Sequence, residues 1–98
     1  MEKFSLKWND FYNTLTSSIP DIRNNGELFD VTLVCEDNKK VNAHKVVLAS
    51  TSPFFRHLLN IMDHPHPLFY MKGVTSKHLE YVLDFIYQGE VNIYQDDF

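Results

Sequence analysis

Histidine and cysteine are the residues best suited to metal binding or nucleophilic chemistry, and the 98-residue sequence contains five histidines and one cysteine. His64 and His66 flank Pro65, which directs their rings apart, and no cysteine or histidine lies at zinc-finger spacing from them. His78 lies in a helical pattern without a second histidine four residues away. We therefore expect loop and surface histidines, and no metal site.

The only thiol, Cys35, lies within an apolar strand pattern, where burial raises the thiol pKa and makes the group unreactive. His44 lies between a predicted strand and a buried helix, so we interpret it as a hydrogen-bonded structural residue rather than a catalytic base. The three glycines are scattered and form no phosphate-binding loop, and no serine occupies a nucleophile elbow. We predict that the chain is not an enzyme and uses no cofactor.

Two charged residues, Asp30 and Lys45, lie beside residues that should be buried. Asp30 precedes the apolar pattern that begins at Val31, and Lys45 begins a helical pattern directly after His44. One interpretation is that each is a solvated end or a helix cap. Because charges near a core are tolerated mainly when paired, the other is that the two residues line one cleft. Their sequence spacing does not decide between the two.

Composition indicates one folded domain with neither a basic surface nor a membrane span. The hydrophobic fraction is 44%, and a chain of 98 residues can bury one core. The 13 acidic and nine basic residues give a net charge of −4, so we expect no direct contact with nucleic acid. No apolar run approaches the roughly 20 residues of a membrane span. A single cysteine fits a reducing compartment, and we expect a soluble intracellular protein.

The N-terminal residues 4–8 alternate between apolar and polar types. This alternation predicts a short strand with Phe4, Leu6 and Trp8 on one face. An apolar face at a chain end must be covered, either by the core of the same domain or by a neighbouring chain.

An amphipathic helix is predicted next, capped by Asn9 or Asp10 and running towards Arg23. Its apolar residues, at spacings of four, four and three, are Phe11, Leu15, Ile19 and Ile22. Pro20 lies within this pattern and removes a backbone hydrogen bond, so we expect a kink or an early end near Ser18.

Residues 42–55 organise the rest of the chain, and they begin at the end of a predicted pair of strands. Alternating apolar residues predict strands at 29–35 and 40–44, with turn residues between them. Two short apolar helices follow, one from Lys45 and one from Pro53 to Asn60. Ser52 is the expected N-cap of the second helix, and proline suits its first position. We interpret the two helices as a pair packed on the core.

A proline-containing loop at 62–67 is followed by a predicted strand at 68–71. A helix with a broad buried stripe is predicted from Thr75 or Ser76 to Gln88, ended by Gly89. Residues 91–93 form a last short strand, and residues 94–98 resemble the start of another helix. The order of elements predicts a single α+β domain over residues 1–98, with helices gathered on a small sheet.

Four motifs of the chain resemble those of BTB/POZ domains. They are Phe29-Asp30-Val31-Thr32-Leu33, Ala43–Ser50, Ser52–Phe55 and Leu83–Val91. The opening Phe4–Asn9 and the His66-Pro67 loop are similar to the tramtrack/bric-à-brac subgroup of arthropod BTB zinc-finger proteins, which includes longitudinals-lacking-like proteins. The resemblance extends from Phe4 to Phe98 and implies the BTB/POZ fold.

The resemblance also implies a homodimerising module of a nuclear transcription regulator, whose DNA-binding part lies elsewhere in the protein. In the family, the N-terminal strand is swapped and pairs with the last strand of the partner. The dimer interface implied for this chain consists of Phe4, Leu6, Trp8, Phe11, Leu15, Val91 and Ile93. Asp30 and Lys45 match the family's charged pocket at the floor of the dimer. Assemblies larger than dimers, related BTB domains and corepressors are further implied partners.

The family's closing pair of helices has no counterpart before Phe98, so we expect the domain to lack it. The resemblance leaves one alternative function, that of a substrate adaptor of a cullin-based ubiquitin ligase. Such adaptors usually carry a helical extension and a Kelch or similar substrate-binding part. Sequence beyond Phe98 discriminates between the two, because zinc-finger spacing supports a transcription regulator and propeller repeats support an adaptor.

Overall fold

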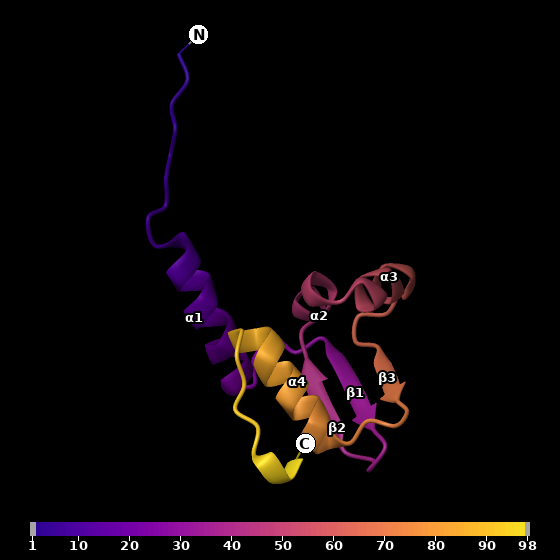
Figure 1. The fold of residues 1–98 in the computed structure, drawn as a ribbon. Coiled ribbons are helices and arrows are strands. Elements are labelled where there is room, and N and C mark those ends of the chain that lie inside the picture. Colours follow the sequence, from indigo (N-terminus) through magenta and orange to yellow (C-terminus); the bar gives the residue numbers. More distant parts are fainter. Residues whose placement is uncertain (1, 98) are drawn as a thin grey trace.

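The computed structural model describes residues 2–97, which form four α-helices, three strands and one short 3₁₀-helix (Figure 1). The helices are α1 (Phe11–Asn24), α2 (Lys45–Thr51), α3 (Pro53–Ile61) and α4 (Ser76–Gln88). The strands are β1 (Val31–Cys35), β2 (Lys40–Ala43) and β3 (Leu68–Met71), and the 3₁₀-helix η1 covers Gln95–Asp97. The predicted α+β architecture, with helices clustered on a small sheet, is confirmed.

The sheet places β1 between β2 and β3. β1 pairs antiparallel with β2, with Val31 opposite Ala43 and Leu33 opposite Val41, and it pairs in parallel with β3. Because side chains alternate along a strand, Val31, Leu33 and Cys35 share one face, and all three are fully buried. β1 begins two residues later than predicted and β2 ends one residue earlier.

The hydrophobic core lies between this face of the sheet and helices α2 and α4. The core residues of the two helices are Val47 and Leu48 of α2 and Leu79, Leu83 and Tyr87 of α4. Residues four apart on a helix lie on one face, so the α4 contribution is a single line of side chains. The predicted stripe on α4 is too broad, because Val82 and Phe85 lie beside this line and are more than half exposed.

Cap residues set the ends of the helices that cover the core. Ser52 Oγ accepts a hydrogen bond from the Phe55 N–H at 3.3 Å, at the start of α3. Thr75 accepts an equivalent bond from a backbone N–H of α4 at 3.4 Å. Gly89 ends α4 with a φ of 83°, a left-handed conformation that glycine adopts without steric cost. These three caps agree with the predicted boundaries.

Helix α1 does not end near Ser18, contrary to the early end considered for Pro20. The φ of proline is compatible with a helix, and its cost is one lost hydrogen bond and crowding of the preceding turn. The helix continues to Asn24, and its last turn carries Arg23, whose ion pairs with α4 are described below. These tertiary contacts hold the turn that follows the proline in helical form.

Residues 4–8 and 91–93 do not form strands in this chain, contrary to the predictions. A strand needs a neighbouring segment to accept and donate its backbone hydrogen bonds. Residues 2–8 extend away from the folded body, and residues 90–94 turn back alongside α4 rather than beside the sheet (Figure 1). Neither segment has a ladder partner within residues 2–97.

Candidate interaction surface

Apolar side chains of the N-terminal segment, defined as residues 2–8, lie in solvent. Leu6 is fully exposed and Phe4 is 85% exposed. Trp8 contacts Phe11 of α1 edge to face, with 5.3 Å between the ring centroids. Exposed apolar side chains so close together are unfavourable in water, so this segment is a candidate interaction surface.

Helix α1 continues this apolar surface for one further turn. Phe11 and Leu15 are four residues apart, so they are neighbours on one helix face, and both are exposed. Ile19, the next residue at this spacing, instead packs against the core. The predicted amphipathic stripe is therefore divided, with its first half open to solvent and its second half packed on the domain.

Val91 and Ile93 belong to the return segment, defined as residues 89–94, which follows α4 and runs back alongside it (Figure 1). These two side chains line an apolar groove of about 360 Å³ together with three residues of α4, namely Tyr81, Val82 and Phe85. The structure thus brings Val91 and Ile93 together on one surface. The N-terminal segment of the same chain does not line this groove.

Asp30 and Lys45, the predicted charged pair, meet through a backbone group. Asp30 Oδ1 accepts a hydrogen bond from the backbone N–H of Lys45 at 2.7 Å. This N–H has no partner within α2, so the carboxylate caps the helix and opposes the positive end of its dipole. The Lys45 ammonium instead donates to the backbone carbonyl of His64 at 2.8 Å. A charged pocket shared between two copies of the chain stays a prediction.

Asp30 borders a mostly apolar pocket of about 270 Å³, whose other lining residues are Ile19, Ile22, Leu28, His44 and Val46. Leu28 and Val46 are largely exposed, and sequence reasoning missed both. Leu28 has a positive φ of 61°, which its sequence does not signal. Val46 could have been found, because the run Val46-Val47-Leu48 is wider than the face that one helix can bury.

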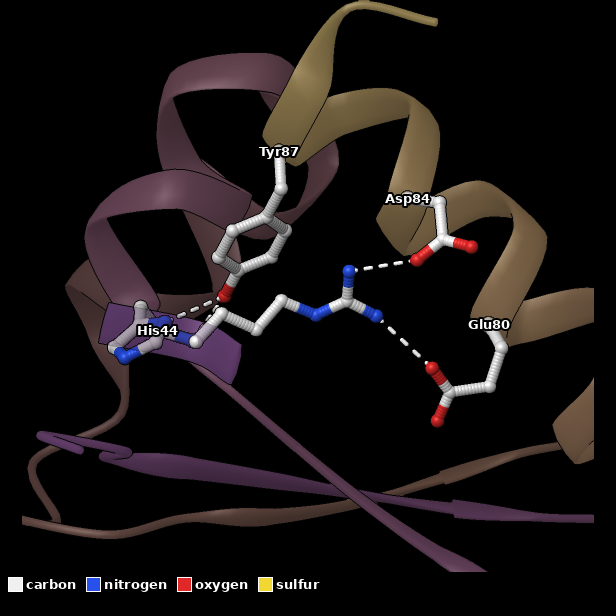
Figure 2. Close-up of polar contacts among 5 residues, drawn as sticks. His44, Glu80, Asp84 and Tyr87 are labelled. Carbon is white, nitrogen blue, oxygen red and sulfur yellow. Dashed lines mark hydrogen bonds and ion pairs between the residues drawn. The ribbon is translucent and has the colours of Figure 1, made fainter. Parts of the chain in front are cut away.

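A buried hydrogen-bond network lies beneath this surface and joins the end of β2 to α4 (Figure 2). Tyr87 Oη accepts a bond from the His44 backbone N–H at 3.0 Å and lies 2.6 Å from His44 Nδ1. His44 Nε2 lies 2.8 Å from the Glu27 carbonyl oxygen. A carbonyl only accepts, so Nε2 carries a proton and Nδ1 accepts from the Tyr87 hydroxyl. Burial raises the pKa of Tyr87, which keeps this hydroxyl protonated. The predicted structural role of His44 is confirmed.

Arg23 of α1 completes the network. Its Nη1 lies 2.7 Å from Asp84 Oδ1 and its Nη2 lies 2.9 Å from Glu80 Oε2. The guanidinium carbon of Arg23 lies 4.8 Å from the centre of the Tyr87 ring. Figure 2 shows the carboxylates of Glu80 and Asp84 projecting from consecutive turns of α4. The Arg23 side chain is only 12% exposed, so solvent screens these contacts less than it screens surface pairs.

Sequence reasoning missed the contacts of Arg23, although a signal exists. Glu80 and Asp84 are like charges four residues apart on one helix, an arrangement that is unfavourable unless a cation lies between them. The identity of that cation depends on the packing of α1 on α4, which the sequence pattern does not specify.

Within residues 2–97, no cluster of three or more histidine, cysteine, aspartate or glutamate side chains is arranged to hold a metal ion. None of the helices in this part of the chain has the length and apolarity needed to cross a membrane. Cys35 is buried, and burial, followed by the charges of Asp37 and Glu80, raises the pKa of its thiol.

Residues 19–98 match the family model of the BTB/POZ domain. The chain is 41% identical over 95 residues to Longitudinals lacking protein-like of Drosophila melanogaster, an alignment that covers 97% of this chain and 74% of that protein. It is 41% identical over 92 residues to Protein abrupt of the same organism, covering 94% of this chain. The chain spans only 10% of the length of Protein abrupt.

Among solved structures, the chain is similar to the BTB domain of zebrafish PATZ1, with a TM-score of 0.73 and 19% identity. This match covers 96% of the chain and 76% of the PATZ1 chain, and at this identity it establishes the fold alone. The Drosophila relatives agree with the tramtrack/bric-à-brac subgroup that the N-terminal motif predicted. The chain belongs to the BTB/POZ domain family and is a protein-interaction module, not an enzyme.

Proposed function

We propose that the chain is a homodimerising module of a nuclear transcription regulator. The observation that carries this proposal is the continuous exposed surface that runs from the N-terminal segment onto α1. Its members are Phe4, Leu6, Trp8, Phe11 and Leu15. A second copy covers this surface, because each copy supplies both contacting surfaces of a two-fold interface. The Phe11 and Leu15 face of α1 packs on the same face of the second copy, and the N-terminal segment packs on the second copy's return segment.

The apolar area is of the order needed to offset the cost of association. Burying an exposed aliphatic or aromatic side chain stabilises an assembly by about 1.5–3 kcal/mol. Covering Phe4, Leu6 and Trp8 in both copies therefore contributes about 9–18 kcal/mol, against an association cost of about 4–15 kcal/mol. Asp30 and Lys45 lie at the floor of this interface. Their charges fix the orientation of the two copies relative to each other and contribute little of the affinity.

In this dimer, the N-terminal segment of each copy is swapped onto the return segment of the other. Both segments lack a ladder partner within residues 2–97, and both present apolar residues with a period of two. Phe4, Leu6 and Trp8 cover Val91 and Ile93 of the second copy, in the groove beside α4. On the opposite face of the pairing, the lysines of the N-terminal segment lie near Glu90, and unlike charges favour cross-strand pairing.

The wider role follows from dimerisation. A protein ten times longer than this module, such as Protein abrupt, has room for a DNA-binding part, and linking two such parts raises avidity through effective concentration. Nuclear localisation belongs to this proposal. Recruitment of corepressors, pairing with related BTB domains and assembly beyond the dimer are further uses of the same surface.

Sedimentation velocity of the purified chain over a dilution series tests the dimer. We expect wild type at twice the monomer mass and Leu6→Asp at the monomer mass, because the new carboxylate cannot be buried in the apolar groove. The matched control is Ser5→Asp, which places the same charge one residue away on the opposite face and leaves the dimer intact. A monomeric wild type at every concentration, or a dimeric Leu6→Asp, contradicts the proposal.

A reporter assay tests the transcriptional part. Fusion of the chain to an unrelated DNA-binding domain should lower expression from a reporter that carries its binding sites, and Leu6→Asp should relieve this effect while Ser5→Asp should not. Equal reporter expression with and without the fused chain contradicts corepressor recruitment and leaves dimerisation as the remaining activity.

A further inference from the structure

The return segment is fixed at both of its ends although it belongs to no sheet. At the first end, the Gly89 N–H donates to the Phe85 carbonyl at 2.7 Å and closes α4. At the far end, the Asp97 N–H donates to the Tyr94 carbonyl at 2.9 Å, within the turn of η1. The conformation of residues 89–94 therefore depends on what holds η1 in place.

Asp97 holds η1 on α4. Its Oδ1 lies 2.5 Å from the ammonium of Lys77, and its Oδ2 accepts a hydrogen bond from the Tyr81 hydroxyl at 2.5 Å. Lys77 and Tyr81 are neighbours on one face of α4 because they are four residues apart. One carboxylate thus bridges two consecutive turns of the helix, and its side chain is only 12% exposed.

The chemistry of this contact keeps the carboxylate ionised at neutral pH. Hydrogen bonds from Lys77 and then from Tyr81 hold the pKa of Asp97 below its ordinary range, and the nearby His78 acts in the same direction. Charge-assisted hydrogen bonds are shorter and stronger than neutral ones. Tyr81 also lines the groove that contains Val91 and Ile93, so the contact and the groove share one side chain.

We propose that Asp97 is a positioning residue for self-association. By binding Lys77 and Tyr81, it holds Val91 and Ile93 beside α4 in the extended form that receives the N-terminal segment of a second copy. This inference rests on the proposed function, because it assigns the return segment as the receiving surface. The residue contacts no part of the second copy and acts through the conformation of residues 89–94.

The size of the effect follows from the population of the receiving form. When a binding-competent form is present for only a fraction of the time, the apparent Kd rises by the inverse of that fraction. A return segment that is competent about one tenth of the time weakens each receiving surface about tenfold. A two-fold dimer uses the surface twice, so its Kd rises about 100-fold.

The test compares dimer dissociation constants for Asp97→Asn and for a matched control, Asp96→Asn. Asp96 is the neighbouring acid, it is exposed, and it makes none of the side-chain contacts found within residues 2–97. We expect a higher Kd for Asp97→Asn, about 100-fold if the receiving form falls to about one tenth of the population, and an unchanged Kd for Asp96→Asn. Equal dissociation constants for Asp97→Asn and wild type overturn the positioning role and leave the proposed dimer intact. A monomeric wild type overturns both.

Tyr81→Phe keeps the inference falsifiable if Asp97→Asn is poorly folded. It removes one hydroxyl from the Asp97 contact and leaves the aromatic ring in the wall of the groove. We expect a higher Kd with an unchanged circular dichroism spectrum, and an unchanged Kd overturns the inference.

Hydrogen exchange in a monomeric background separates positioning from direct contact between copies. Amides of residues 90–94 should exchange faster in Leu6→Asp/Asp97→Asn than in Leu6→Asp, while amides of β1 should not change. Equal exchange at residues 90–94 in the two variants shows that Asp97 does not order the return segment and overturns the inference.

Discussion

The Tyr87 hydroxyl lies 2.6 Å from Nδ1 of His44 and 3.0 Å from the backbone nitrogen of the same residue. Tyr87 of α4 thereby forms hydrogen bonds with both the ring and the backbone of His44, the residue that precedes α2. The guanidinium of Arg23 lies over the Tyr87 ring, so α1 is joined to the same point. Three elements of the interaction module are held relative to one another by this cluster.

Tyr87→Phe should lower the free energy of unfolding by about 1–3 kcal/mol, because it leaves the buried Nδ1 and N–H of His44 without a partner. Chemical denaturation at fixed protein concentration measures the loss. The control is Tyr70→Phe, which removes a hydroxyl from an exposed ring and should change stability little. An equal loss for both variants contradicts the role of the Tyr87 hydroxyl.

Arg23→Lys should destabilise the chain by about 1–3 kcal/mol, since a lysine ammonium cannot reproduce the fork that binds Asp84 and Glu80 together. Thermal unfolding, followed by circular dichroism, measures the change. Arg56→Lys is the matched control, because the Arg56 side chain is exposed on α3. If both substitutions leave the melting temperature unchanged, the contact between α1 and α4 does not depend on the Arg23 fork.

Substitutions of Asp30 distinguish a helix cap from a charged pair. Asp30→Ala should cost about 0.5–2 kcal/mol, because the first N–H of α2 loses its acceptor. Asp30→Asn retains an oxygen acceptor at the same position and should cost less than half as much. Denaturant titration of both variants at the same protein concentration measures the difference. Equal losses for Asn and Ala favour the predicted charged pocket over the cap.

Asp37 predicts a dependence of stability on pH. The Ser76 hydroxyl donates to its Oδ2 at 2.7 Å, and hydrogen bonds from Ser76 hold the pKa of the Asp37 carboxyl below its ordinary value. A carboxyl whose pKa is lower in the folded chain stabilises the fold above its unfolded pKa of about 3.9. That contribution is lost as the pH falls through the lower, folded value.

Asp37→Asn should therefore melt at a lower temperature than wild type at neutral pH, and the two melting temperatures should converge as the pH falls below about 3.9. Asp63→Asn is the control, because Asp63 is an exposed loop carboxylate. A difference between Asp37→Asn and wild type that is constant from neutral to acidic pH contradicts the assignment.

The parts of the fold that depend on nearby residues could be predicted from the sequence. The strand around Leu33, the N-cap at Ser52 and the end of α4 at Gly89 are each determined by residue types within one or two turns of the chain. The structural role of His44 also followed from its position between a strand and a buried helix.

Contacts between distant residues could not be predicted in the same way. Arg23 and Asp84 are 61 residues apart, and their contact depends on how α1 packs on α4. Residues 4–8 have strand periodicity, but periodicity cannot supply the hydrogen-bond partner that a strand requires. Pro20 leaves open whether α1 kinks or ends near Ser18, and the contacts that keep the following turn helical, as far as Asn24, lie on distant residues.

Helix α1 is held by the domain near its C-terminal end, at Ile19 and Arg23, while Phe11 and Leu15 remain open. Its 14 residues span about 21 Å. A small rotation of α1 about the ion pairs of Arg23 therefore displaces its N-terminal end by a larger distance. A rotation of about 10° at these ion pairs moves the Trp8 end by about 4 Å. In the proposed dimer, the angle between the two copies therefore depends on Arg23, Glu80 and Asp84, and we expect substitutions of Glu80 or Asp84 to alter the geometry of the assembly.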